Sequence, residues 1–334
     1  MSSRLRAAVV LGPALRNEVF GPAQWEELAG LVDVVADCHD GQALALHPRR
    51  AEIDVLITSW GMPRLTEDLL RELPSLRIVV HAAGSVRKIV SDAVWARGIV
   101  VVSAADANNE PVAEYVYAQT VLALKDVHRR SHRIKSETGL PPLEHIPGIY
   151  RQTVGLISFG SVARKTAALL RRLEADVIAW DPFVTDEAFR AAQVERAGSI
   201  DELFRRAQVL SVHTPLIPGR TERLITEDLL RLLPRDATLI NTARGAVLDE
   251  DGLIRVLQQR PDLYAVLDVT TVEPLPASSL LYALPNVMLT GHVAGTVGGE
   301  RRGMGRLVIA ELRRISGGSA PLHSVSSHAL LLRA

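Results

Sequence analysis

The sequence has little of several features that mark particular classes of protein. Its single cysteine, Cys38, excludes an intramolecular disulfide and a cysteine-rich metal cluster. Its 38 basic and 38 acidic residues balance, so charge gives no argument for binding nucleic acid or an anionic membrane. No apolar run approaches the roughly 20 residues that a membrane span needs. The short apolar run at the start favours a buried first strand over a signal peptide, and we expect a cytoplasmic protein.

What the chain does have is a regular alternation of strand-like and helix-like segments. Short apolar runs of buried-strand type alternate with helical patterns such as Val86–Arg97. A long helical pattern covers Asn108–Val127, with Pro111 suited to its first turn, and a polar loop follows at Ser136–Gly148. The alternation then resumes and runs to a last helix at about Gly299–Ile315. This order predicts an α/β protein with parallel sheets, and 334 residues are enough for two domains.

One stretch, between residues 151 and 181, has the pattern of a dinucleotide-binding unit. Two apolar runs of strand type enclose a small-residue turn and a helical segment. In such units the pyrophosphate lies on N–H groups at the helix start, and an acid after the second strand, here Asp181, binds the ribose hydroxyls. The G-x-G-x-x-G fingerprint is represented by Ser158, Gly160 and Ala163. The alternative interpretation is an ordinary turn of a parallel sheet.

Three polar residues that could carry chemistry follow buried-strand patterns in the second half. Arg244 has the planar guanidinium that binds a carboxylate through two parallel hydrogen bonds. A histidine with a carboxylate partner can hold a proton at neutral pH and give it away, which makes His292 and Glu273 a candidate acid–base pair. Each has an ordinary alternative: a loop salt bridge, a capped loop histidine and a solvated turn residue. Spacing alone does not show that the three meet in space.

Several motifs resemble the NAD-dependent D-isomer-specific 2-hydroxyacid dehydrogenase family, over about Ile53 to Arg313. The resemblance implies a Rossmann-type nucleotide domain (residues 107–292) inserted into a flavodoxin-like substrate domain (residues 1–106 and 293–334). It also implies a homodimer through the nucleotide domains. The motifs are Ser-Val-His-Thr-Pro-Leu (211–216), Leu-Ile-Asn-Thr-Ala-Arg-Gly-Ala-Val-Leu-Asp-Glu (239–250), Leu-Asp-Val-Thr-Thr-Val-Glu-Pro-Leu-Pro (267–276), Leu-Thr-Gly-His-Val-Ala-Gly-Thr (289–296) and Val-Ala-Glu (112–114).

The resemblance also implies roles for individual residues. Arg244 would anchor the substrate carboxylate, His292 would donate and accept the proton, and Glu273 would orient His292. Asp181 would bind the adenosine ribose and Asp268 the nicotinamide carboxamide. The full set expected around NAD is Gly160, Ser161, Val162, Asp181, His213, Thr214, Thr242, Ala243, Arg244, Asp268, His292 and Gly295. The set expected around the substrate is Trp60, Gly84, Ser85, Arg244 and His292. No metal is expected.

The sequence therefore predicts reversible hydride transfer between NAD(H) and C2 of a D-2-hydroxy acid or 2-oxo acid. Two alternatives stay open: a non-catalytic NAD-sensing protein of the same fold, and a dehydrogenase of another small anion such as phosphite. Ser158 and Gly291 depart from the family pattern, which has glycine at the first position and usually proline at the second. The bulky and cationic side chains that we expect near the cleft are compatible with a bulky or a phosphorylated acid: Trp60, Met62, Arg64, Arg87 and Lys88.

Overall fold

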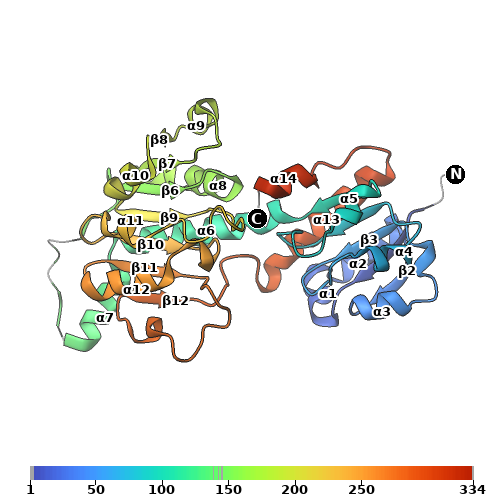
Figure 1. The fold of residues 1–334 in the computed structure, drawn as a ribbon, viewed down its shortest axis with the longest axis horizontal. Helices are drawn as coiled ribbons and strands as arrows, with labels where there is room; N and C mark the ends of the chain where they lie inside the picture. Colours follow the sequence, from blue (N-terminus) through green and yellow to red (C-terminus); the bar gives the residue numbers. More distant parts are fainter. Residues whose placement is uncertain (1–3, 138, 142, 144–145, 333–334) are drawn as a thin grey trace. The chain divides into compact units, whose positions relative to one another are not determined.

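The computed structural model describes residues 4–137, 139–141, 143 and 146–332. The chain divides into two compact units, Met1–Asn109 with Thr296–Ala334, and Glu110–Gly295 (Figure 1). The first unit is thus built from both ends of the chain. These divisions lie at 109/110 and 295/296, whereas the predicted domain boundaries are at 106/107 and 292/293.

The sheet of the first unit has the strand order of a flavodoxin-like domain. Its strands are β1 (Arg6–Val10), β2 (Asp33–Cys38), β3 (Val55–Thr58), β4 (Ile78–His81), β5 (Val100–Ser103) and β13 (Ser324–Val325). They lie in the order β13-β5-β4-β3-β1-β2, all parallel except β13. The order changes direction at β1, so ligands are expected beyond the carboxyl ends of β1 and β3.

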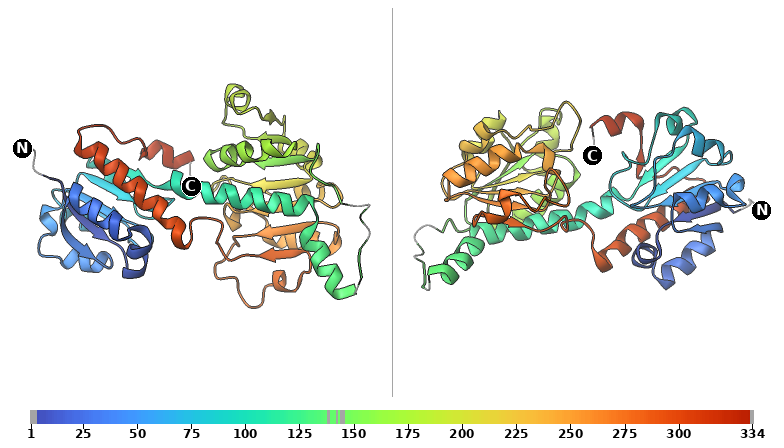
Figure 2. Two further views of the ribbon diagram at one scale, coloured as in Figure 1. Left: turned by 180° about the vertical axis from the view of Figure 1, so that it is seen from behind. Right: turned by 60° about the horizontal axis from the view of Figure 1, so that its bottom comes forward.

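Helices cover both faces of this sheet (Figure 2). Two apolar clusters form its core. The helices are α1 (Pro13–Val19), α2 (Pro22–Leu31), α3 (Gly41–Leu46), α4 (Glu67–Arg71), α5 (Asp92–Ala96), α13 (Arg301–Ser316) and α14 (Ser327–Leu332), with 3-10 turns η1 (Arg50–Glu52) and η5 (Gly298–Glu300). The predicted helix Val86–Arg97 is wrong in its first half, and only α5, in its second half, is helical. Leu65 N–H donates to Ile89 O, and Ser91 Oγ donates to Leu65 O, so bonds to a distant loop replace the helical bonds.

The sheet of the second unit has the order of a Rossmann domain. Its strands are β6 (Thr153–Ile157), β7 (Asp176–Trp180), β8 (Glu195–Arg196), β9 (Val209–Val212), β10 (Thr238–Asn241), β11 (Tyr264–Leu267) and β12 (Val287–Leu289). They lie in the order β12-β11-β10-β9-β6-β7-β8, and every pair is parallel. The order changes direction between β6 and β9, where doubly wound sheets bind dinucleotides.

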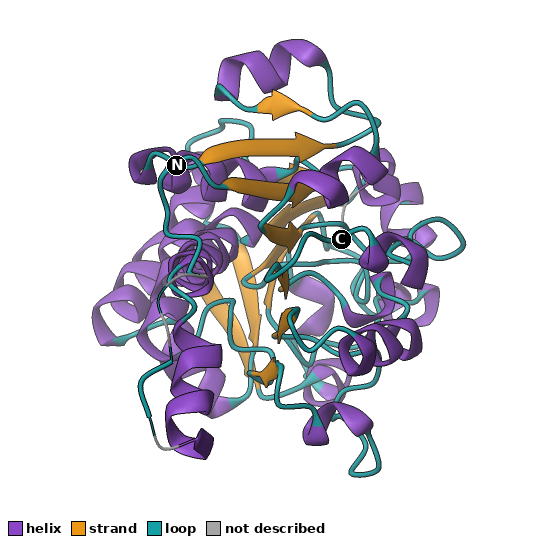
Figure 3. Ribbon diagram, turned by 90° about the vertical axis from the view of Figure 1, so that its left-hand side faces the viewer, coloured by secondary structure: helices purple, strands orange, loops and turns teal. Residues whose placement is uncertain are grey.

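The helices of this unit again pack on both faces of the sheet (Figure 3). They are α7 (Val127–Glu137), α8 (Ser161–Leu170), α9 (Asp186–Ala192), α10 (Ile200–Arg206), α11 (Glu227–Arg231) and α12 (Glu250–Gln259), with 3-10 turns η2 (Arg171–Leu173), η3 (Gly245–Val247) and η4 (Leu280–Ala283). The two-domain α/β fold with parallel sheets is confirmed.

The long helix α6 (Ala105–Leu124) crosses from the first unit into the second. It begins before the predicted Asn108 and ends before the predicted Val127, so Pro111 lies inside it rather than in its first turn. The separate helix α7 was not predicted. Asp126, with φ +54°, interrupts the helical backbone between α6 and α7. None of the helices in the described part of the chain combines the length and apolar character of a membrane span.

Candidate active site

The turn after β6 shows how the chain accommodates serine in the first fingerprint position. Ser158 has φ +68°, in the left-handed region that favours glycine. Its N–H donates to Trp180 O at 2.8 Å, and its hydroxyl lies 2.9 Å from the Thr214 hydroxyl. Thr214 follows β9, so this hydrogen bond joins the two strand ends on either side of the point where the strand order changes.

The start of α8 is suited to an anionic group. Gly160 is the residue before the helix, and as a glycine it has no side chain that could cap the helix N-terminus. A Cβ atom at Gly160 would meet no described atom within 4 Å, so the space in front of the helix is open. Ser161 and Val162 are the first helical residues. Helix N-termini of this kind bind phosphates through backbone N–H groups and the helix dipole.

Asp181 lies at the end of β7 and is held in place by backbone N–H groups. Its Oδ2 accepts from Phe159 N and its Oδ1 from Phe183 N, both at 2.8 Å. A carboxylate can accept more than one hydrogen bond on each oxygen, so lone pairs remain for ribose hydroxyls. The Phe159 bond ties Asp181 to the turn that precedes α8.

Two predicted cofactor residues have buried polar atoms without hydrogen-bond partners in the described structure. They are His213 Nε2, after β9, and Thr242 Oγ1, after β10. Such atoms are uncommon in folded proteins because an unpaired buried polar group costs free energy. Burial lowers the pKa of His213 to about 3, so its ring is neutral at physiological pH. With the open start of α8 and the position of Asp181, these residues fit a bound dinucleotide.

Arg244 lies in a tight loop after β10 that neighbouring residues shape. Asn241 closes this loop, because its side chain accepts from Ala243 N at 3.0 Å and donates to Arg244 O at 3.2 Å. Gly245 is required next, since a Cβ atom there would lie 1.9 Å from the backbone carbon of Thr270. Burial lowers the pKa of Arg244, while the charge of Glu273 acts in the opposite direction. Sequence reasoning did not single out Asn241, although its place at a strand end next to the arginine loop was a usable signal.

His292 and Glu273 are in direct contact. His292 Nδ1 lies 2.7 Å from Glu273 Oε2, and Glu273 Oε1 accepts from Thr270 N at 3.2 Å. The two side chains are 52% and 40% exposed, so a substrate can reach them. Gly291 has φ +70° and His292 φ +65°. Proline cannot adopt a positive φ, so glycine before His292 is consistent with this loop conformation.

Asp268 is 2% exposed and accepts several hydrogen bonds from the loop that carries His292. Its Oδ1 accepts from Thr290 Oγ1 at 2.7 Å and from Val293 N at 2.8 Å, and its Oδ2 accepts from Ala294 N at 3.0 Å. Its backbone carbonyl accepts from His292 N at 2.6 Å. Gly295 ends this loop. Oδ2 keeps a lone pair that fits the predicted contact with a carboxamide.

The remaining predicted substrate residues belong to the first unit. Trp60, after β3, is 44% exposed, and the Arg301 guanidinium lies 5.3 Å from its ring centroid. The loop that carries Gly84 and Ser85 follows β4. A hydrogen bond from Ser103, a residue that the sequence analysis did not identify, holds this loop. Ser103 Oγ donates to Gly84 O at 2.6 Å.

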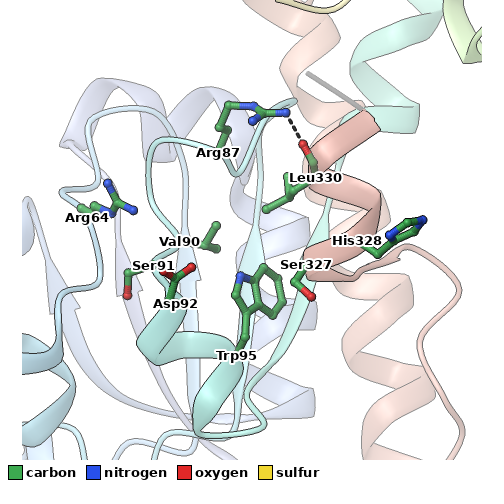
Figure 4. A pocket seen from close by; sticks show the side chains of 9 residues that line it. All are labelled: Arg64, Arg87, Val90, Ser91, Asp92, Trp95, Ser327, His328 and Leu330. Carbon is green, nitrogen blue, oxygen red and sulfur yellow. Dashed lines mark hydrogen bonds between the residues drawn. The ribbon is translucent and has the colours of Figure 1, made fainter. Parts of the chain in front are cut away.

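A pocket of about 420 Å³ also lies in the first unit, between α5 and α14 (Figure 4). Its lining includes the two cations Arg64 and Arg87, and Arg87 donates a hydrogen bond to Leu330 O. Trp60, Gly84, Ser85 and Lys88 do not line it. The pocket therefore does not coincide with the predicted substrate contacts of this unit.

The sequence of the chain is similar to those of known proteins. The family model of the D-isomer specific 2-hydroxyacid dehydrogenase, NAD binding domain, matches residues 117–294. The chain is 32% identical over 256 residues to (S)-sulfolactate dehydrogenase of Chromohalobacter salexigens, covering 76% of this chain and 82% of that protein.

Two further proteins are similar to only part of the sequence or share mainly the fold. The chain is 28% identical over 266 residues to D-3-phosphoglycerate dehydrogenase of Methanocaldococcus jannaschii, covering 79% of this chain but only 50% of that protein. It thus spans about half the length of this relative. The structure of D-mandelate dehydrogenase from Rhodotorula graminis superposes with a TM-score of 0.80 at 21% identity, over 97% of this chain and 98% of that one, and shares the fold.

Proposed function

The chain belongs to the D-isomer-specific 2-hydroxyacid dehydrogenase family, and on that premise we propose that it transfers hydride between NAD(H) and C2 of a D-2-hydroxy acid or 2-oxo acid. The observation that carries this proposal is the 2.7 Å contact between His292 and Glu273. A non-catalytic NAD-binding protein has no need of an accessible acid–base pair. The pair lies in the unit that the family model matches as an NAD-binding domain.

In the proposed reaction the protein binds, orients and moves a proton. NADH, when bound, supplies the hydride. His292 Nδ1 faces Glu273, so Nε2 is the atom that gives its proton to the carbonyl oxygen as that oxygen becomes a hydroxyl. Arg244 binds the substrate carboxylate and stabilises the negative charge that develops on the carbonyl oxygen. Oxidation reverses these steps, and Nε2 then takes the hydroxyl proton.

The remaining residues are assigned to cofactor and substrate. Asp181 binds the adenosine ribose and favours NAD over NADP, because a carboxylate repels a 2′-phosphate. The start of α8 holds the pyrophosphate, His213 and Thr242 contribute the polar atoms described above, and Asp268 holds the carboxamide. In the first unit, Gly84 and Ser85 donate N–H bonds to the substrate carboxylate, and Trp60 contacts the rest of the substrate.

The test is a screen of NADH and NADPH oxidation with a panel of 2-oxo acids. Glyoxylate, hydroxypyruvate, phosphohydroxypyruvate, pyruvate, sulfopyruvate and aromatic 2-oxo acids cover small, phosphorylated, sulfonated and bulky side chains. We expect turnover with at least one acid and a preference for NADH. Arg244→Lys should lower kcat/KM by about 10²-fold, because lysine cannot make the two parallel hydrogen bonds.

Each other outcome of the screen points to a different conclusion. No turnover with any acid, together with tight NADH binding, would support an NAD-sensing protein. A separate assay with phosphite and NAD tests the other alternative, which NADH formation in that assay would support. Arg244→Lys with wild-type kcat/KM would remove Arg244 from the substrate site.

We also propose that the protein is a homodimer formed through the second unit. Helix α7 exposes Val127 and Ile134, each 40% exposed, seven residues apart and so on one face of the helix. Leu140, which follows the helix, is 87% exposed. Apolar side chains exposed on one helix face, such as Val127 and Ile134, mark interaction surfaces.

Light scattering after size exclusion tests this assembly. The wild-type chain should have twice the monomer mass, and Ile134→Glu should shift it toward the monomer. Leu46→Glu is the matched control, because Leu46 is an equally apolar, 74% exposed residue in the other unit. A monomeric wild type at micromolar concentration would contradict the proposal.

A further inference from the structure

A chain of hydrogen bonds reaches from helix α6 to the loop of His292. The Tyr115 hydroxyl lies 3.0 Å from Thr290 Oγ1, and Thr290 Oγ1 lies 2.7 Å from Asp268 Oδ1. Asp268 in turn accepts from Val293 N and Ala294 N, and its carbonyl accepts from His292 N. Three consecutive N–H groups, from residue 292 to residue 294, therefore depend on this one aspartate.

The direction of the chain follows from the chemistry of its ends. An ionised carboxylate only accepts hydrogen bonds, so Thr290 O–H donates to Asp268. Thr290 has one hydroxyl proton, so its oxygen must accept from the Tyr115 O–H. Burial raises the pKa of Tyr115, and the charge of Asp268 raises it as well. The phenol thus stays protonated and able to donate at neutral pH.

The bond from Thr290 decides how the Asp268 side chain is turned. The two N–H groups of the loop approach Oδ1 and Oδ2 separately, and both bonds persist only while the carboxylate keeps one orientation. Thr290 contacts Oδ1 and restricts the rotation of the carboxylate, and Tyr115 fixes the Thr290 hydroxyl. Because Asp268 is 2% exposed, water cannot readily replace these partners.

We propose that Tyr115 and Thr290 are positioning residues for the acid–base histidine: their hydroxyls orient Asp268, and Asp268 holds His292 against Glu273. This inference rests on the proposed function. We call Tyr115, Thr290 and Asp268 the relay. Its hydrogen bonds matter because the backbone of the loop is strained at His292. Gly291 and His292 both have positive φ, and a non-glycine residue in that conformation persists only where surrounding bonds hold it.

Removal of the hydroxyls one at a time tests the relay. Thr290→Val keeps the shape of the side chain and removes the hydroxyl, and we expect kcat to fall by about 10²-fold with substrate KM little changed. Thr290→Ser restores the hydroxyl and should recover most of kcat. Tyr115→Phe leaves Thr290 bonded to Asp268, so its loss should be smaller, on the order of tenfold.

Two matched controls separate the relay from general packing. Thr166→Val removes a buried hydroxyl on α8 that has no hydrogen-bond partner in the described structure. Tyr117→Phe removes a phenol hydroxyl from a tyrosine of α6 that packs against the apolar core. Both should keep wild-type kcat. If Thr290→Val lowers kcat no more than Thr166→Val, or if Thr290→Ser fails to restore it, the proposal is overturned.

A readout that needs no turnover keeps this inference separate from the proposed function. In the nitrogen-15 NMR spectrum of the histidine rings, the His292 signals are assigned by their loss in His292→Gln. The wild type should show one tautomer with the proton on Nδ1, and Thr290→Val should show exchange between tautomers. Equal spectra would overturn the relay even if the enzyme is active. An inactive wild type with this spectral difference would overturn only the proposed function.

Discussion

Two histidines of the second unit follow parallel strands, and their surroundings give them different chemistry. His213 comes directly after β9, its Nε2 is buried without a partner in the described structure, and burial lowers its pKa to about 3. His292 comes three residues after β12, is half-exposed and contacts Glu273 at 2.7 Å. A buried ring without an acid partner stays neutral and can only offer a hydrogen bond. Solvent access and a carboxylate partner are what suit a ring to proton transfer.

The largest effect that we expect comes from removing the ring of His292, and removing the ring of His213 tests whether the two histidines differ in role. His292→Ala should lower kcat for 2-oxo acid reduction by about 10³-fold or more, because it removes the ring nitrogen proposed to give the proton. NADH binding should be retained. His213→Ala should leave kcat within a few-fold of wild type and weaken NADH binding. Steady-state kinetics and quenching of NADH fluorescence measure the two quantities. If His292→Ala loses NADH binding, its role is structural; if His213→Ala loses only kcat, the two roles have been exchanged.

The same comparison predicts how stability depends on pH. The pKa of His213 is lower in the folded than in the unfolded protein, so between about pH 6.5 and 3 the unfolded chain binds more protons. The stability that the neutral ring contributes is complete above about pH 6.5 and is lost as the pH falls through this window. In urea unfolding at pH 7 and pH 5, His213→Gln should therefore lose less stability on acidification than wild type. The exposed His132 supplies the control variant, His132→Gln, whose loss should match wild type.

The sequence predicted the strands better than the helices. Most strands of the two sheets are four to six residues long, and burial on two faces leaves a run of apolar residues as a signal, as in the fully buried β10. The helical pattern at Val86–Arg97 was misleading because the residues before α5 form hydrogen bonds to a loop at Leu65 instead of helical bonds. The start of α6 was missed because the residues before Pro111 (Ala-Asp-Ala-Asn-Asn-Glu) carry no regular apolar period.

At the site, sequence reasoning found the reacting groups but not what holds them. Arg244, Glu273 and His292 were identified because a guanidinium, a carboxylate and an imidazole at strand ends are chemically distinctive. Thr290 and Tyr115 have no such mark, and their contact joins positions 175 residues apart. Contacts of this kind depend on how helices lie against the sheet, which local spacing does not encode.

The smallest expected effect concerns the turn after β6, the counterpart of the His292 loop in that both place a non-glycine residue at positive φ. At Ser158 two terms oppose each other. The left-handed backbone costs roughly 1 kcal/mol for a residue with a Cβ atom, and the hydrogen bond to Thr214 contributes about as much. Ser158→Gly loses both terms, so its free energy of unfolding should lie within about 1 kcal/mol of wild type. Ser158→Ala loses the bond and keeps the backbone cost, so it should be the less stable variant by about 1 kcal/mol in urea unfolding. The opposite order would show that Ser158 leaves the left-handed conformation in solution, and that the bond to Thr214 does not fix the turn on which the cofactor site is proposed to be built.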